Sequence, residues 1–187
     1  MSATDKIKLA KKASSSLAIA STVQKDTALE AIAKLLVASV PEIVAANKND
    51  LEKAKTDGLS EGLQDRLMLN ADRIGALASS MREIIALPDP IGGVVRGMAL
   101  PNGLKLSEVR VPFGVIGAIY EARPNVTVDI TALALKSGNA VVLRGGTAAE
   151  NTNIALVKVL QQGLAEAGLS SDLVQTVDDF GERAPTK

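Results

Sequence analysis

The feature that most constrains the fold is an alternation of short apolar runs with helical patterns after residue 114. The apolar runs span 115–120, 140–143 and 173–177. Their length and their content of Val, Ile and Leu are typical of strands that are buried on both faces. The two segments between them have helical patterns, at 125–136 and from Thr147 to Gly168. This order predicts an α/β fold with a partial Rossmann-like βαβαβ parallel sheet, half of a doubly wound sheet.

The first 90 residues follow a helical pattern instead. Apolar residues recur at steps of three and four from Leu29 to Ile43 and again from Ile74 to Ile84, which is the spacing of one helix face. Pro41 predicts either a kink or the first turn of a new helix. Gly58 is a plausible helix stop, and Asn70 is a good N-cap for the last helix. A looser apolar stripe, Ile7, Ala10, Leu17 and Ala20, lies near the N-terminus.

Two strand-like runs, 94–99 and 104–111, flank the sequence Pro101-Asn102-Gly103. Asn-Gly supplies the positive φ angles of a tight turn, so the runs predict a β-hairpin. Because a two-stranded hairpin is marginal in water by itself, we expect it to pack against something else, such as another subunit.

These patterns divide the chain into four parts. We expect a helical N-terminal region, a hairpin that is a possible oligomerisation element, a partial dinucleotide-binding domain and a disordered tail, at 1–90, 91–112, 113–178 and 179–187.

Two absences in the composition restrict the chemistry. The chain has no Cys, which excludes disulfides, thiolate catalysis and Cys metal sites within it, and no His, so the commonest general base and metal ligand are missing. Lys plus Arg and Asp plus Glu are both 21, and a zero net charge argues against a nucleic-acid binder. No apolar run is long enough to span a membrane, and the N-terminus does not resemble a signal peptide, so we expect a cytoplasmic protein without metal.

The loop that follows the second apolar run is the first candidate site, since ligands of open α/β sheets bind beyond the carboxyl ends of the strands. Gly145 and Gly146 let a ligand approach the backbone, Arg144 suits a phosphate, and the next helix offers free N–H groups. A dinucleotide would fit these features. The alternative is a tight turn beside a solvated Arg144, and the usual GxGxxG fingerprint is absent.

That next helix carries a capping pattern of its own. Thr147 and Glu150 are spaced as a capping box, with Thr147 as the cap. Ile154, Val157 and Leu160 are expected to face inward from it.

The loop that follows the first apolar run is the second candidate. Asn125 could cap its helix, or its amide could donate to a developing oxyanion. Arg123 could hold an anionic substrate, or it could pair with Glu121 on the surface.

The residues of these loops resemble a known family. The run Tyr-Glu-Ala-Arg-Pro-Asn at 120–125, within 111–129, and the segment 135–146 resemble gamma-glutamyl phosphate reductase, also called glutamate-5-semialdehyde dehydrogenase, of the aldehyde dehydrogenase superfamily. The segments 45–51 and 101–104 fit the same family, and the resemblance extends to about Val177.

The resemblance implies an NADPH-dependent reduction of L-glutamyl 5-phosphate to L-glutamate 5-semialdehyde in proline biosynthesis, through a Cys thiolate and a thioester. It also implies a Rossmann-type cofactor domain, a catalytic domain and an oligomerisation hairpin. By position, Arg144 is a candidate for the 2′-phosphate of NADPH, and Gly145, Gly146 and Thr147 would line that pocket. Asn125 or Arg123 would lie near the reacting carbonyl or the nicotinamide.

The chain departs from this family in length and in its missing thiol. Family members are about twice as long, and their nucleophilic Cys lies in the part that has no counterpart here. We therefore expect a truncated, split or frame-shifted reading frame whose product is inactive alone. Its partner would be a complementary C-terminal half or further copies of itself. The alternatives are a non-catalytic module that docks onto an intact reductase, and a poorly soluble remnant.

Overall fold

Five helices precede the first strand in the computed structural model, which describes residues 1–177. They are α1 (Ala3–Leu17), α2 (Thr22–Ala38), α3 (Val40–Thr56), α4 (Glu61–Leu67) and α5 (Ala71–Ala86). The segment 179–187, which the sequence predicts to be a disordered tail, lies outside the described residues.

Local sequence explains where several of these helices begin and end. Pro41 lies in the first turn of α3, so the second of the two interpretations of this proline is confirmed. Gly58 has a φ of +74° and follows the end of α3. Asn70 caps α5, because its Oδ1 accepts a hydrogen bond of 2.8 Å from the backbone N–H of Arg73. The short helix α4 was not predicted.

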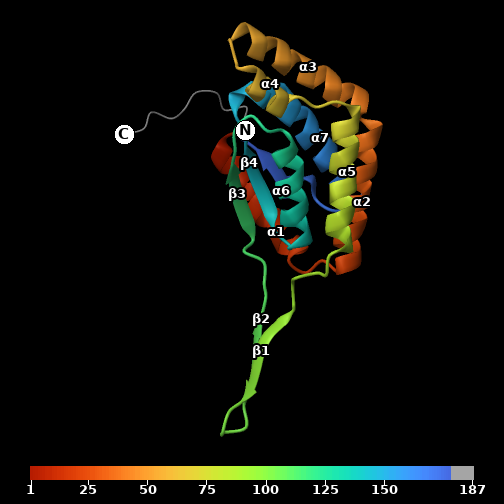
Figure 1. Ribbon diagram of the computed structural model, residues 1–187. Coiled ribbons are helices and arrows are strands. Elements are labelled where there is room, and N and C mark those ends of the chain that lie inside the picture. Colours follow the sequence, from red (N-terminus) through yellow and green to blue (C-terminus); the bar gives the residue numbers. More distant parts are fainter. Residues whose placement is uncertain (178–187) are drawn as a thin grey trace.

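The predicted hairpin is confirmed. Strands β1 (Val94–Ala99) and β2 (Lys105–Val109) pair antiparallel, and the N–H of Leu100 donates to the carbonyl of Leu104 at 2.8 Å across the turn. The positive φ angle falls on Gly103, at +85°. Every residue of both strands is exposed, and Figure 1 shows the hairpin as an arm that projects away from the rest of the molecule.

The predicted βαβαβ unit is also confirmed. Strands β3 (Val115–Ile119), β4 (Ala140–Arg144) and β5 (Val174–Thr176) pair in parallel, in the order β3-β4-β5. Helix α6 (Asn125–Lys136) joins the first two strands, and α7 (Glu150–Glu166) joins the last two. Short 3-10 turns, at Thr147–Ala149 and Ser171–Leu173, precede α7 and β5. Strand β4 lies in the middle, and only its last residue, Arg144, is exposed.

The helices form layers on this sheet. α6 and α7 pack on one face of the sheet, α1 lies against the strands from the other, and α2 and α5 form an outer layer over α6 and α7 (Figure 1). A single apolar cluster contains residues from α1, α2 and α5 as well as from the sheet. The helical region and the parallel sheet therefore share one core, and this sharing fixes α5 relative to the carboxyl ends of the strands.

Two residues of the apolar stripes noted in the sequence are exposed. Ile154 of α7 is 46% exposed and Ile7 of α1 is 48% exposed, whereas Leu160 and Leu17 on the same helices are buried. The inward orientation predicted for Ile154 is therefore wrong. It lies on the side of α7 that faces away from the shared core. Among the described residues, no helix has the length and apolar character needed to cross a membrane.

Candidate functional site

The two candidate loops lie together at the carboxyl ends of β3 and β4. Ile119 pairs with Arg144 in the parallel register, and the N–H of Tyr120 donates to the carbonyl of Arg144 at 3.1 Å. Gly146 packs against the backbone of the loop after β3. A Cβ added to Gly146 would lie 3.2 Å from the carbonyl carbon of Glu121, so the close approach of the two loops requires a glycine there.

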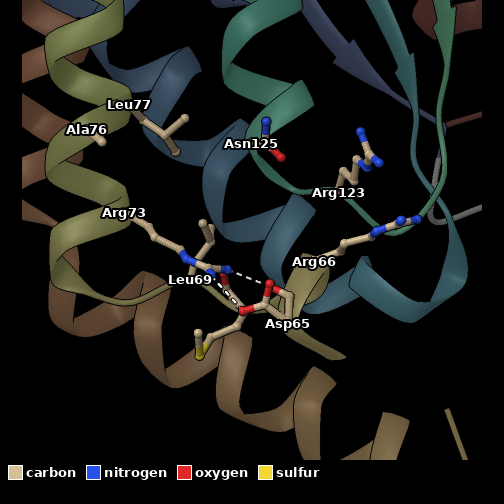
Figure 2. A pocket seen from close by; sticks show the side chains of 9 residues that line it. Asp65, Arg66, Leu69, Arg73, Ala76, Leu77, Arg123 and Asn125 are labelled. Carbon is tan, nitrogen blue, oxygen red and sulfur yellow. Dashed lines mark hydrogen bonds and ion pairs between the residues drawn. The ribbon is translucent and has the colours of Figure 1, made fainter. Parts of the chain in front are cut away.

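A pocket of about 380 Å³ opens beside the loop after β3. Arg123 and Asn125 line it from that loop and from the start of α6. Helices α4 and α5 supply the opposite wall, as Figure 2 shows. The wall consists of Asp65, Arg66, Met68, Leu69, Arg73, Ala76 and Leu77. Residues 144–147 do not line this pocket, so the structure brings the two loops into contact without placing all the candidate residues in one cavity.

The three arginines that line this pocket differ in whether an acidic residue pairs with them. Arg73 is bound to α4, because its guanidinium donates to the carboxylate of Asp65 at 2.7 Å and to the carbonyl of Met68 at 3.0 Å. The guanidinium groups of Arg66 and Arg123 have no hydrogen bond or ion pair with any described residue. The alternative in which Arg123 pairs with Glu121 is therefore not what the structure shows.

Asn125 does not cap its helix, and the capping interpretation was wrong. The N-cap position of α6 is Pro124, and no side chain caps it. The Nδ2 of Asn125 instead donates to Oδ2 of Asp129, one turn along α6, at 3.2 Å. Burial raises the pKa of Asp129 above its ordinary value of 3.8, and the hydrogen bond from Asn125 partly offsets that rise. Asn125 is half-buried at the pocket wall with its carbonyl oxygen available.

The helix that follows β4 is capped by a residue distant in the sequence. Thr147 lies in a 3-10 turn and caps nothing, so the predicted capping box is wrong. The carboxylate of Asp50, from α3, accepts hydrogen bonds from the backbone N–H of Asn151 at 3.2 Å and of Thr152 at 2.7 Å. Two of the N–H groups expected to be free for a phosphate are thus already bound to a buried carboxylate.

A buried amide lies beneath the glycine loop. Asn153 of α7 is fully buried; its Oδ1 accepts a hydrogen bond of 2.9 Å from Thr127, and its Nδ2 has no partner. A Cβ added to Gly145 would clash with this Nδ2. Gly145 therefore leaves room for a protein side chain below the loop.

Arg144 and Thr147 are the members of the loop that face solvent. Arg144 has no ion pair or side-chain hydrogen bond to any residue in the range 1–177. The planar, always charged guanidinium is suited to a phosphate group, and here no described acidic residue competes for it. No group of His, Cys, Asp and Glu that could hold a metal occurs among the described residues.

Sequence reasoning missed several residues that shape the site. Asn47 of α3 is buried, and it donates to the carbonyl of Leu67 at 2.8 Å and accepts from the N–H of Leu69 at 2.7 Å. These bonds fix the segment between α4 and α5 that forms a wall of the pocket. Asp50 and Arg66 were also missed. A polar residue in an apolar helical stripe is the only local signal, and it does not identify a partner that lies far away in the sequence.

Comparison with known proteins gives a consistent answer. The gamma-glutamyl phosphate reductase of Leifsonia xyli subsp. xyli is 59% identical over 180 residues, which are 96% of this chain and 43% of that protein. The solved gamma-glutamyl phosphate reductase of Thermotoga maritima is 41% identical with a TM-score of 0.92, over 95% of this chain and 43% of that one. The chain belongs to the gamma-glutamyl phosphate reductase family. The resemblance inferred from the sequence is confirmed.

The similarity covers a part of the reductase fold. The chain spans about two fifths of the length of the curated reductases it matches, and it corresponds to the N-terminal part of their fold. A probable aldehyde dehydrogenase of Listeria monocytogenes shares this fold, with a TM-score of 0.70 at 19% identity over 93% of this chain and 36% of that one. No protein-family model matches the chain.

Proposed function

We propose that the chain is the cofactor-side part of a gamma-glutamyl phosphate reductase. The activity of the complete assembly would be the NADPH-dependent reduction of L-glutamyl 5-phosphate to L-glutamate 5-semialdehyde in proline biosynthesis, in the cytoplasm. The observation that carries the proposal is the 59% identity to a reductase over 96% of the chain. The meeting of two loops at the carboxyl ends of β3 and β4 supports it, because ligands of open α/β sheets bind there.

The residues present fit the cofactor at one of its ends. NADPH, when bound, supplies the hydride that reduces an acyl group to an aldehyde. Arg144 would hold the 2′-phosphate through its guanidinium, which has no partner in the described part of the chain, with Thr147 as a neighbouring hydroxyl donor. Gly145 and Gly146 would line the cofactor site through their backbone. The first turn of α7 is a poor phosphate site, since the carboxylate of Asp50 occupies its N–H groups.

The pocket beside β3 would receive the substrate. Arg123 would bind an anionic group of L-glutamyl 5-phosphate, and Asn125 would support the reacting carbonyl. An amide N–H that points at a developing oxyanion stabilises it most where water is excluded. The Nδ2 of Asn125 has a second hydrogen besides the one that faces Asp129, so this donation is compatible with the hydrogen bond observed.

The thiolate of the proposed mechanism would come from a complementary C-terminal part, because this chain has no Cys. Strand β3 pairs with β4 on one side and with no described strand on the other, and Ile119 at its end is 82% exposed. In the doubly wound order 3-2-1-4, the fourth strand pairs beside the first, which is β3 here. The open edge of β3 would therefore receive a parallel strand from the complementary part.

The hairpin would serve as an oligomerisation element. Its strands are exposed along their whole length, and Val94, Met98 and Leu106 are each at least 44% exposed. An isolated two-stranded ribbon with exposed apolar side chains gains stability by packing on a partner. A second copy of the assembly would supply that partner.

Complementation tests the proposed activity. The chain is mixed with the C-terminal remainder of the Leifsonia xyli reductase, and NADPH oxidation is followed with L-glutamyl 5-phosphate. Turnover that needs both parts, and that is lost when the remainder carries Ser in place of its nucleophilic Cys, would support the proposal. An inactive mixture, when the intact Leifsonia enzyme is active in the same assay, would count against it.

Nucleotide binding tests the role of Arg144. We expect Arg144→Gln to weaken NADPH binding about tenfold while leaving NADH binding within about twofold, because only NADPH carries the 2′-phosphate. Fluorescence titration of the wild-type chain and the variant measures both constants, alone and with the complementary part present. Arg110→Gln, on the hairpin side of the molecule, is the matched control. Equal losses for both nucleotides would contradict the assignment.

A further inference from the structure

The pocket beside β3 is lined by more positively charged side chains than negatively charged ones. Three arginines line it, and Asp65 is the one acidic residue among the lining residues. The carboxylate of Asp65 is bound to Arg73 at 2.7 Å. Two guanidinium groups, those of Arg66 and Arg123, therefore line the same pocket without a protein partner among residues 1–177.

Arg66 is held at the pocket by a rigid support. It occupies the last turn of α4, next to Leu67, which is fully buried, and the end of α4 is bound to Asn47 through the carbonyl of Leu67. The Asp65–Arg73 pair joins α4 to α5 from the other side. The backbone of Arg66 is thus fixed on both sides while its side chain extends freely.

Arg123 is presented from a different element, the loop after β3. Its N–H donates to the carbonyl of Glu121 at 2.7 Å in a tight turn, and the next residue, Pro124, is buried. Figure 2 shows Arg66, Arg123 and Asn125 on one side of the pocket, and Ala76 and Leu77 of α5 on the other. The pocket therefore combines a cationic side with an apolar side.

We propose that Arg66 and Arg123 form an anion clamp that binds a carboxylate or phosphate group, with the aliphatic stem of the ligand against Leu69 and Leu77. Two guanidinium groups without carboxylate partners favour a doubly coordinated anion, because charge-assisted hydrogen bonds are about twice as strong as neutral ones. An acyl phosphate with a short aliphatic chain and a terminal carboxylate has this chemistry. The clamp rests on the proposed function for the identity of its ligand, and it assigns a substrate-binding role to Arg66.

Two simple probes test the clamp in the complete chain. Inorganic phosphate offers the anion alone, and glutarate offers a carboxylate on a three-carbon aliphatic stem. Their binding is followed by NMR through the Nε–H signals of Arg66 and Arg123. We expect saturable shifts of both signals with at least one probe, and binding about tenfold weaker in Arg66→Gln and in Arg123→Gln. A preference for glutarate identifies a carboxylate end in the clamp, and a preference for phosphate identifies the phosphate end.

The controls separate the clamp from the fold and from the proposed activity. Arg66 is exposed, so Arg66→Gln should unfold at the wild-type temperature, Arg66→Lys should bind with intermediate affinity, and Arg110→Gln should bind like the wild type. Wild-type affinity in Arg66→Gln, or no saturable shift in the wild type, overturns the clamp. NADPH binding is measured on the same samples. If NADPH does not bind while the anion does, the proposed function fails and the clamp stands.

Discussion

The loops after β3 and after β4 differ in how the rest of the molecule uses them. The loop after β3 borders a pocket in which the guanidinium groups of Arg66 and Arg123 lack partners among residues 1–177. The loop after β4 leads into a helix whose first N–H groups are bound to Asp50, and a buried amide fills the space below its glycine. Both loops have the position and the residue types of a ligand site. The pocket lined by Arg123 and Asn125 adjoins the loop after β3, and the loop after β4 offers its exposed side chains instead.

The difference teaches that a helix N-terminus is an anion site only where no carboxylate of the protein already satisfies it. Asp50 lies on α3, in the helical N-terminal region, far from the strands and from α7 in the sequence. Its carboxylate binds the start of α7 and thereby helps to hold the helix into which the glycine loop leads. The ligand-binding role proposed for that loop is thereby restricted to Arg144 and its neighbours.

The largest effect is expected from Asp50→Ala. The substitution removes the acceptor of the backbone N–H of Asn151 and of the N–H and hydroxyl of Thr152, which is fully buried. We expect the free energy of unfolding to fall by about 3 kcal/mol, since buried donors are left without partners. Urea denaturation measures this value.

The matched control for Asp50 is Glu52→Ala on the same helix. Glu52 forms an exposed ion pair with Lys48 at 3.8 Å, so its loss should change the free energy of unfolding by about 0.5 kcal/mol or less. Equal effects of the two substitutions would show that Asp50 does not stabilise the start of α7.

A smaller loss is expected from Gly145→Ala. The new methyl group would overlap the Nδ2 of buried Asn153, and overpacking of this kind costs about 2 kcal/mol. Combining Gly145→Ala with Asn153→Ala should recover part of that loss in a double-mutant cycle. Gly117→Ala in β3 is the control, because a Cβ there contacts nothing within 4 Å. Strictly additive effects in the cycle would rule out the proposed overlap.

The smallest effect is expected from Asp129→Asn on α6, whose carboxylate accepts a hydrogen bond from Asn125 of the pocket beside β3. Burial raises the pKa of Asp129, so the folded state binds its proton more tightly than the unfolded state does. The contribution of Asp129 to stability is therefore complete below pH 3.8 and is lost as the pH rises through its folded-state pKa. Because the group is partly solvated, the difference should be less than about 1 kcal/mol.

The measurement for Asp129 is the free energy of unfolding of wild type and variant from pH 3 upward. Asp129→Asn should remove a contribution to the free energy of unfolding that decreases as the pH rises. The substituted amide still has an oxygen that can accept the hydrogen bond from Asn125. Parallel stability curves for the two proteins would contradict the raised pKa.

Most of the fold could be predicted from the sequence because its signals are local. The strands β3, β4 and β5 are apolar runs, α5 begins at Asn70, and the hairpin turns at Gly103. Each depends on residues within one or two turns of the backbone. Helix α4 was missed because its seven residues are too few for a helical period to be recognised.

The site was less predictable because its decisive contacts are distant in the sequence. The residues Arg123, Asn125 and Arg144 could be chosen from their place after strands, but the wall that faces Arg123 comes from α4 and α5. The capping interpretations of Asn125 and Thr147 failed for the same reason. Local spacing indicates which residues are able to cap a helix, and the tertiary contacts determine which residue does so.

The contact between Asp50 and Thr152 spans 102 positions, and it constrains the order in which the molecule assembles. During synthesis α3 leaves the ribosome long before α7, so the acceptor exists before the helix that needs it. The first turn of α7 gains its hydrogen-bond acceptor only once α3 packs against it. A shortened chain that began after α3 would still contain the sequences of all three parallel strands, but the first turn of α7 would lack its acceptor. The N-terminal helices thus supply a contact that the first turn of α7 needs in order to be fully hydrogen-bonded.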